Sequence, residues 1–152
     1  LGAEAEALFE LALDHGVAAL CAEAVGAMDF LQQTTLAYLR ERKQFGRPLA
    51  QFQVLQHRMV DMFIALEEAT SLSQHLNLSV AEGDPQGSKL ASGAKSKIGE
   101  AARFVGEQAI QLHGGLGMSD ELNVGHYFQR IAPINIQFGD PTYHLLRYAR
   151  AG

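Results

Sequence analysis

Two segments of the sequence carry residue types that suit the binding of a phosphate-containing ligand. Residues 42–46 (RKQFG) place an arginine, whose planar fork can bind phosphate oxygens, beside an aromatic ring and a glycine. Residues 111–117 (QLHGGLG) hold three glycines, which can present backbone N–H groups to an anion. Each segment taken singly is also typical of a helix end, because cations and glycines are common there.

Two further segments are not explained by packing alone. Residues 52–56 (FQVLQ) place two amides at the start of an apolar stripe. Residues 138–142 (FGDPT) form a turn in which Asp140 or Thr142 can cap a following helix. Amides can hydrogen-bond a ligand or a backbone, so these segments are candidates for binding as well as for capping.

Composition excludes several classes of function. The chain has 152 residues and a net charge of −5, which argues against a nucleic-acid binder. Its single cysteine, Cys21, allows no intrachain disulfide, which fits a reducing compartment, and we expect it to be a buried apolar residue. The six histidines form no tight ligand pair, and the sequence has no CxxC motif, so no metal site is expected.

The sequence offers no charge-free stretch long enough to cross a membrane. The most apolar region, residues 17–31, is interrupted by Glu23 and Asp29, so no membrane span is expected. The sequence begins at Leu1 and shows no signal-peptide pattern, which suggests a fragment or a processed chain. Together with the cysteine count, this predicts a cytoplasmic protein.

Apolar residues recur at helical spacing along most of the chain. The stripes predict one helix over about 3–42, for which a joint near residues 15–16 is an alternative, and two more over about 52–80 and 91–112. A turn cluster fills residues 82–88, and shorter helices are expected over 120–130 and 141–151. No segment alternates with period two. The fold class is therefore all-α, an up-down four-helix bundle with short extra helices, in which Met59 and Met62 are core residues.

Taken together, the motifs resemble a known family. Arg42/Phe45/Gly46, then Phe52/Gln53/Gln56, then Gln111/Gly114/Gly115/Gly117, in this order and spacing, resemble the C-terminal helical domain of acyl-CoA dehydrogenases. The resemblance covers residues 1–152 as one such domain. It implies that the N-terminal helical domain and the middle β-domain of the family lie outside this chain.

The resemblance implies a flavoenzyme that oxidises an acyl-CoA thioester between its α and β carbons. It implies FAD as cofactor, an acyl-CoA substrate, an electron-transfer partner, and a homo- or hetero-oligomer, dimer or tetramer. The residues implied to contact FAD, in the family typically that of a neighbouring subunit, are Arg42, Gln44, Phe45, Gln53, Gln111, Gly114 and Gly115.

The sequence departs from the family at the catalytic base. The position of the usual glutamate holds Phe138, and the alternative position on the first helix aligns with about Gly16. Neither can accept a proton, so the catalytic residue is unknown. Asp140 and Asp14 lie within two residues and are the candidates for a displaced base. The competing interpretations, which we favour, are Asp140 as a helix N-cap and Asp14 as a solvated helix residue.

The turn at Phe138 most resembles a subgroup that includes pimeloyl-CoA and steroid-side-chain dehydrogenases. In that subgroup unlike subunits can pair, and one of them lacks the usual base. Three hypotheses follow: an acyl-CoA dehydrogenase, a non-catalytic flavin-holding subunit of one, or a helical assembly module without flavin. Residues 1–152 alone are expected to fold without retaining FAD or activity.

Overall fold

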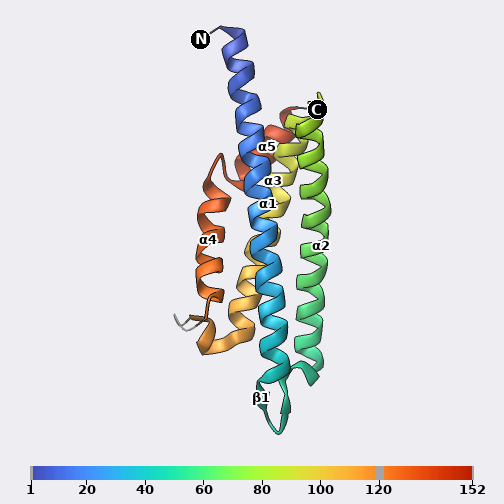
Figure 1. The fold of residues 1–152 in the computed structure, drawn as a ribbon, viewed down its shortest axis with the longest axis vertical. Coiled ribbons are helices and arrows are strands. Elements are labelled where there is room, and N and C mark those ends of the chain that lie inside the picture. Colours follow the sequence, from blue (N-terminus) through green and yellow to red (C-terminus); the bar gives the residue numbers. More distant parts are fainter. Residues whose placement is uncertain (1, 119–121, 152) are drawn as a thin grey trace.

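The computed structural model describes residues 2–118 and 122–151 of the chain. Its long helices are α1 (Ala3–Glu41), α2 (Gln53–Glu82) and α3 (Gly87–His113), followed by α4 (Val124–Ile136) and α5 (Pro141–Arg150). Helices α1 to α4 run up and down along one axis, with α4 beside α1, and α5 lies across the end opposite the α1–α2 connection (Figure 1). The predicted all-α bundle is confirmed.

The core lies between α1, α2 and α3, as the apolar stripes predict. Leu31, Met62 and Ile98, one from each helix, are each at most 1% exposed. Burying a side chain of this size contributes about 1.5–3 kcal/mol. On α3 the buried stripe is rich in alanine, glycine and serine, which lets its neighbours approach closely. Met59 and Met62 are buried core residues, as expected.

Most helix ends agree with the sequence, and two details differ. Helix α1 runs unbroken through residues 15–16, so the alternative of a joint there is wrong. The glycines at positions 83 and 114 end α2 and α3 with φ of 68° and 60°. Helix α4 begins at Val124, later than expected, and continues past the predicted end at Arg130 to Ile136. The expected start, Asp120, lies outside the described residues.

A short hairpin joins α1 to α2, where the sequence indicated no strand. Strands β1 (Lys43–Gln44) and β2 (Arg47–Pro48) pair antiparallel, with Gln44 opposite Arg47. Phe45 and Gly46 form the tip with φ of 54° and 79°, the left-handed pair that a two-residue hairpin turn favours. Two-residue strands are too short to show a period-two pattern. The 3-10 helices η1 (Leu49–Gln51) and η2 (Gly114–Met118) follow β2 and α3.

Helix α1 is the element that bears on the expectation of no membrane span. Within Glu4–Glu41, a window is long and apolar enough to cross a membrane by length and composition alone. However, 44% of that window is buried inside the bundle. The core helix of a bundle has the same length and composition, so these two properties are weak evidence for a span.

Candidate functional site

The seven residues implied to contact FAD lie at one end of the bundle. They stand at the C-terminal end of α1, in the hairpin, at the start of α2 and at the C-terminal end of α3, which meet there (Figure 1). Tyr38 of α1 stacks on His113 of α3 with ring centroids 4.5 Å apart, which joins the two helix ends. All seven are exposed: Arg42, Gln44, Phe45, Gln53, Gln111, Gly114 and Gly115.

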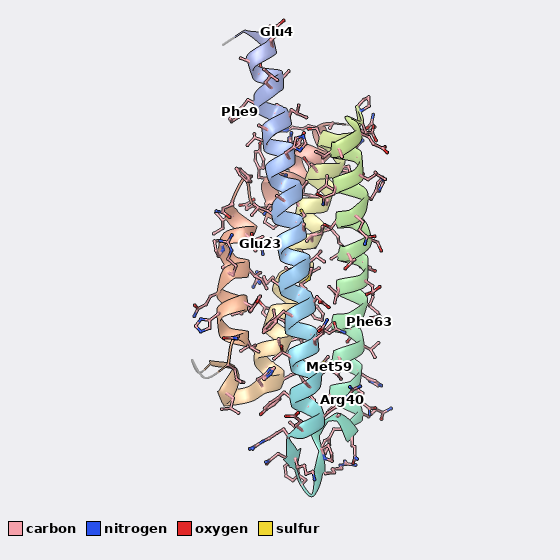
Figure 2. The ribbon with its side chains drawn as sticks, viewed as in Figure 1. Glu4, Phe9, Glu23, Arg40, Met59 and Phe63 are labelled. Carbon is pink, nitrogen blue, oxygen red and sulfur yellow. The ribbon has the colours of Figure 1, made fainter. Side chains whose placement is uncertain are left out.

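The hairpin is rich in positive charge. Arg42, Lys43 and Arg47 are all exposed in it, and Arg40 lies just before it at the end of α1 (Figure 2). The Arg47 guanidinium stacks on the ring of Phe52 at 4.0 Å from its centroid. Within residues 2–118 and 122–151, the Arg42 guanidinium has no ion pair or hydrogen bond. A cation in this state fits a negatively charged ligand.

Local hydrogen bonds fix the corner that carries these side chains. Gln44 Nε2 donates to the Lys43 carbonyl at 2.8 Å, and Gln56 Nε2 donates to the Ala50 carbonyl at 2.8 Å. Gln56, one of the motif amides, therefore holds η1 against α2. Phe45 is 90% exposed at the hairpin tip. A large aromatic ring this exposed, on a left-handed backbone, is poorly explained by packing within the chain.

The glycines after α3 divide into two kinds. A Cβ added at Gly114 or Gly115 would meet nothing within 4 Å, so their backbone is open to an approaching ligand. A Cβ added at Gly117 would lie 2.7 Å from the Ile110 carbonyl oxygen, so packing alone explains that glycine. The first two glycines therefore leave room for the close approach that the resemblance implies, while Gly114 also ends α3 through its φ, and the third glycine has a packing role.

His113, beside these glycines, is a residue whose environment the sequence did not reveal. It is 3% exposed, and its Nδ1 lies 2.8 Å from the Ala109 carbonyl. Its Nε2 is buried and has no hydrogen-bond partner among the described residues. Burial lowers the pKa of His113 below its usual value. The sequence signal for this burial was the position of His113 directly after Leu112, at the end of the apolar stripe of α3.

The turn between α4 and α5 lies toward the other end of the bundle and contains Phe138. The residue has φ of 59°, and its carbonyl oxygen is 2.9 Å from His144 Nε2. A Cβ built on Gly16 of α1 would lie 2.8 Å from Phe138 Cε2. The two positions at which the resemblance places a glutamate are therefore in contact with each other.

The two aspartates near these positions have structural partners. Asp140 Oδ1 accepts a hydrogen bond from the Tyr143 backbone N–H at 2.7 Å, so its predicted role as the N-cap of α5 is confirmed. Asp14 is 6% exposed, and its Oδ1 lies 3.1 Å from Arg147 Nη1. The interpretation of Asp14 as a solvated residue is wrong, because α5 brings Arg147 against this part of α1.

Arg147 is the centre of a polar network that ties α5 to α1 and α3. Besides Asp14, it donates to Glu10 Oε2 at 2.5 Å, to Ser88 Oγ at 2.6 Å and to Ser92 Oγ at 3.1 Å. Its side chain is 21% exposed. A partly buried arginine with this many acceptors fixes the orientation of a short helix.

The environments of Cys21, Lys95 and Arg130 are explained by packing and pairing within the chain. Burial raises the pKa of the Cys21 thiol to about 12, although nearby Lys95 opposes the shift. Lys95 Nζ donates to the Ile134 carbonyl near the end of α4. Arg130 pairs with Glu23 at 2.6 and 3.0 Å, and its hydrogen bond lowers the pKa of Glu23. No group of His, Cys, Asp and Glu in the described part of the chain could hold a metal ion.

Known proteins are similar to this chain in sequence and in fold. The family described as "Acyl-CoA dehydrogenase, C-terminal domain" matches residues 7–152. Acyl-CoA dehydrogenase IpdE2 of Mycolicibacterium smegmatis is 32% identical over 134 residues, which cover 88% of this chain and 41% of that protein. The chain therefore spans less than half the length of this curated relative.

Solved structures agree with the sequence relatives. Butyryl-CoA dehydrogenase from Megasphaera elsdenii is 28% identical with a TM-score of 0.89, over 93% of this chain and 37% of that one. A structure described as PigA with FAD and proline is 29% identical with a TM-score of 0.85, over 91% of this chain and 36% of that one. The chain belongs to the acyl-CoA dehydrogenase family, and its fold is the C-terminal helical domain of that family.

Proposed function

We propose that this chain is the flavin-contacting domain of an FAD-dependent acyl-CoA dehydrogenase, which oxidises an acyl-CoA thioester between its α and β carbons. The observation that carries the proposal is that all seven implied FAD contacts are exposed at the same end of the bundle, the end that carries the hairpin. The relative described as PigA with FAD supports the choice of cofactor.

The residues of this end suit the parts of FAD. Arg42, whose guanidinium has no partner within the described residues, would bind the diphosphate with its planar fork. The open backbone at Gly114 and Gly115 would let phosphate or ring atoms approach closely. The amides of Gln44, Gln53 and Gln111 would bond to polar atoms of the cofactor, and the exposed ring of Phe45 would cover part of it.

When bound, FAD would accept the hydride that leaves the β carbon of the substrate. The contribution of this chain is to hold the cofactor and to exclude water from it. Because the implied contacts reach the FAD of a neighbouring subunit, the proposal includes a homo- or hetero-oligomer, dimer or tetramer. It also includes an electron-transfer partner that reoxidises the flavin, and a location in the cytoplasm.

The test is the affinity of the full-length protein for FAD, measured together with any subunit that copurifies with it. In an Arg42→Ala variant, loss of a charge-assisted contact to phosphate should weaken FAD binding about 10-fold or more. Arg103→Ala is the matched control, because Arg103 is an exposed arginine that, among the described residues, pairs only with Glu107 on α3. Equal FAD affinity in both variants, or full-length protein without flavin, would favour the helical module without cofactor.

Residues 1–152 alone provide a second test. The bundle has its own core, so this segment should fold, but it should retain no FAD, because the rest of the cofactor site lies in the domains it lacks. The measurement is the visible absorbance of the purified segment after incubation with FAD and gel filtration. A yellow segment with a flavin band would contradict this expectation.

A further inference from the structure

Two aromatic rings connect the two segments that are proposed to contact FAD. Tyr38 lies in the last turn of α1, one turn before Arg42, and His113 is the last residue of α3, directly before Gly114. The ring centroids are 4.5 Å apart and the planes meet at 28°, which is a stacked arrangement. Stacked rings stabilise a contact beyond the area that they bury. The pair therefore joins the segment that carries the hairpin to the segment that carries the open glycines.

The His113 ring binds its own helix through one nitrogen and contacts α1 through its face. The Ala109 carbonyl, 2.8 Å from Nδ1, can only accept, so Nδ1 carries the proton and Nε2 is left as an acceptor. Nε2 is buried without a hydrogen-bond donor in the part of the chain that the structure describes. Within that part, the stack with Tyr38 is the one ring contact, hydrogen bond or ion pair that joins this side chain to another helix. The face of the ring, rather than its second nitrogen, therefore makes the connection.

Backbone hydrogen bonds connect each ring to residues that are proposed to contact FAD. The Arg42 N–H donates to the Tyr38 carbonyl at 2.9 Å, and the Arg42 carbonyl accepts from the Leu49 N–H at 2.8 Å, which closes the hairpin. On the other side, the Gly114 N–H donates to the Gln111 carbonyl, so both residues are held by the last turn of α3. The position of one ring relative to the other therefore sets the spacing between Arg42 and the glycines.

The His113 ring lies beneath the exposed surface rather than on it. The residue is 3% exposed, whereas Gly114 and Gly115 are exposed. The chain after them turns back onto His113, because a Cβ added at Gly117 would lie 3.1 Å from His113 Cβ. The ring can therefore act on a bound cofactor through the residues that it positions.

We propose that Tyr38 and His113 are a positioning pair, whose stack sets the distance between Arg42 and the two open glycines so that both contact one FAD molecule at the same time. This inference rests on the proposed function. A binding site needs its contacting groups held within about 0.5 Å by residues that packing fixes. Arg42 is exposed and has no partner of its own within the described ranges, so the ring one turn before it supplies this support.

The experiment measures the dissociation constant of FAD by flavin fluorescence, in the full-length protein with any subunit that copurifies with it. Tyr38→Leu and His113→Leu each remove one ring and should weaken FAD binding about 10-fold. Tyr38→Phe and His113→Phe keep both rings and should stay within about threefold of the wild type. The reason is that the Tyr38 hydroxyl and His113 Nε2 have no hydrogen-bond partner among the described residues. Losses as large in the phenylalanine variants as in the leucine variants, or wild-type affinity in all four, would overturn the inference.

A second stack in the same bundle is the control for a general loss of rigidity. Phe30 of α1 and Tyr127 of α4 stack with centroids 4.0 Å apart, about three turns of α1 before the hairpin. Tyr127→Leu should lower thermal stability as Tyr38→Leu does, but it should change FAD affinity by less than about threefold. Equal weakening of FAD binding in the two variants would show that the loss of any stack has this effect, and the positioning role would be wrong.

A double variant tests whether the pair acts through Arg42. In Tyr38→Leu the guanidinium is already misplaced, so adding Arg42→Ala should weaken FAD binding by less than about threefold, against about 10-fold in the wild type. A 10-fold effect in both backgrounds would contradict the inference. A wild-type protein that binds no FAD would contradict the proposed function, whereas leucine variants that bind FAD like the wild type would contradict the positioning role alone.

Discussion

The two ends of this bundle differ in how far their polar side chains are already paired within the chain. At the hairpin end, the implied FAD contacts are exposed, and the Arg42 guanidinium has no partner among the described residues. At the end where α5 crosses α1, Asp14, Arg147 and Asp140 all have partners inside the chain.

This difference fits the proposal that the exposed groups bind a ligand, whereas the paired groups stabilise the fold. Buried polar groups need partners, because an unpaired one costs about 1–3 kcal/mol. Exposed polar groups carry no such cost, because water solvates them, and they can therefore remain unpaired until a ligand binds. We therefore expect the same residue types, arginine and phenylalanine, to have different roles at the two ends, and substitutions test this expectation.

The largest expected difference is in stability between Arg147→Ala and Arg42→Ala. The first leaves Asp14 buried without its cation, which should lower the free energy of unfolding by about 3 kcal/mol. The second removes an exposed side chain and should change it by less than about 0.5 kcal/mol. Urea denaturation followed by circular dichroism measures both. Similar losses in the two variants would mean that the ends do not differ in this way.

The network at Arg147 also shows which features of the structure could not be predicted from the sequence. Helical spacing predicted α1, α2 and α3, because a helix with one buried face has apolar residues at regular three- and four-residue intervals. Asp14 lies within the first of these helices, yet its partner Arg147 is 133 positions away, and no neighbouring residue indicates this ion pair. The interpretation of Asp14 as solvated was wrong for this reason, whereas the cap at Asp140 depends on residues three positions away and was predicted correctly.

The same contrast between local and long-range signals holds for the glycines. Gly83 and Gly114 end helices and were recognised, because a helix end is a local feature. Gly16 suggested a joint in α1, but the helix is continuous there, and the glycine is explained by a ring 122 positions later. The roles of the FAD contacts stay a prediction, since only a bound cofactor can test them.

The next effect concerns the pH dependence of stability, to which each end contributes one buried histidine. Burial lowers the pKa of His113 and of His144, and nearby Lys95 and Arg147 lower the pKa of His144 further. The unfolded chain therefore binds protons that the folded chain does not. Stability should be full above about pH 6.5 and should fall below it, by at most about 1.4 kcal/mol per pH unit for each histidine.

Variants assign this pH effect to the two ends. His144→Asn, which can still donate to the Phe138 carbonyl, and His113→Asn should each flatten the decrease in urea-derived stability between pH 6.5 and 5. His126→Asn is the control, because His126 is exposed, and it should leave the slope unchanged. A slope that stays the same in both buried-site variants would show that neither histidine is held neutral in the fold.

A smaller effect compares two glycines of α1. An added Cβ at Gly26 would meet nothing within 4 Å, so Gly26→Ala should stabilise the helix by about 0.5–1 kcal/mol. Gly16→Ala brings the same helix gain, but its Cβ presses on Phe138, and overpacking of this kind costs about 1 kcal/mol or more.

The control for this comparison is the Phe138→Ala background, in which the ring is absent. There, Gly16→Ala and Gly26→Ala should stabilise the protein equally, as measured by thermal unfolding. If Gly16→Ala remains less favourable without the ring, the contact with Phe138 is not the reason for the glycine.

The smallest effect comes from the two phenylalanines with left-handed backbone, one at each end. Phe45 is 90% exposed with φ of 54°, and Phe138 has φ of 59° with its ring over Gly16. Asparagine tolerates this backbone better than phenylalanine does. Phe45→Asn should therefore raise the free energy of unfolding by about 0.5 kcal/mol, whereas Phe138→Asn should lower it, because the ring contact is lost.

The sign of the change in the free energy of unfolding in Phe45→Asn tests whether the Phe45 ring acts in binding or in stability. A residue that strains the backbone and packs little against its own chain persists only if it acts elsewhere. Phe45→Asn should thus combine a more stable fold with weaker FAD binding in the full-length protein. A gain in stability with unchanged FAD affinity would remove Phe45 from the proposed cofactor contacts, while a loss of stability would place it with Phe138 as a structural residue.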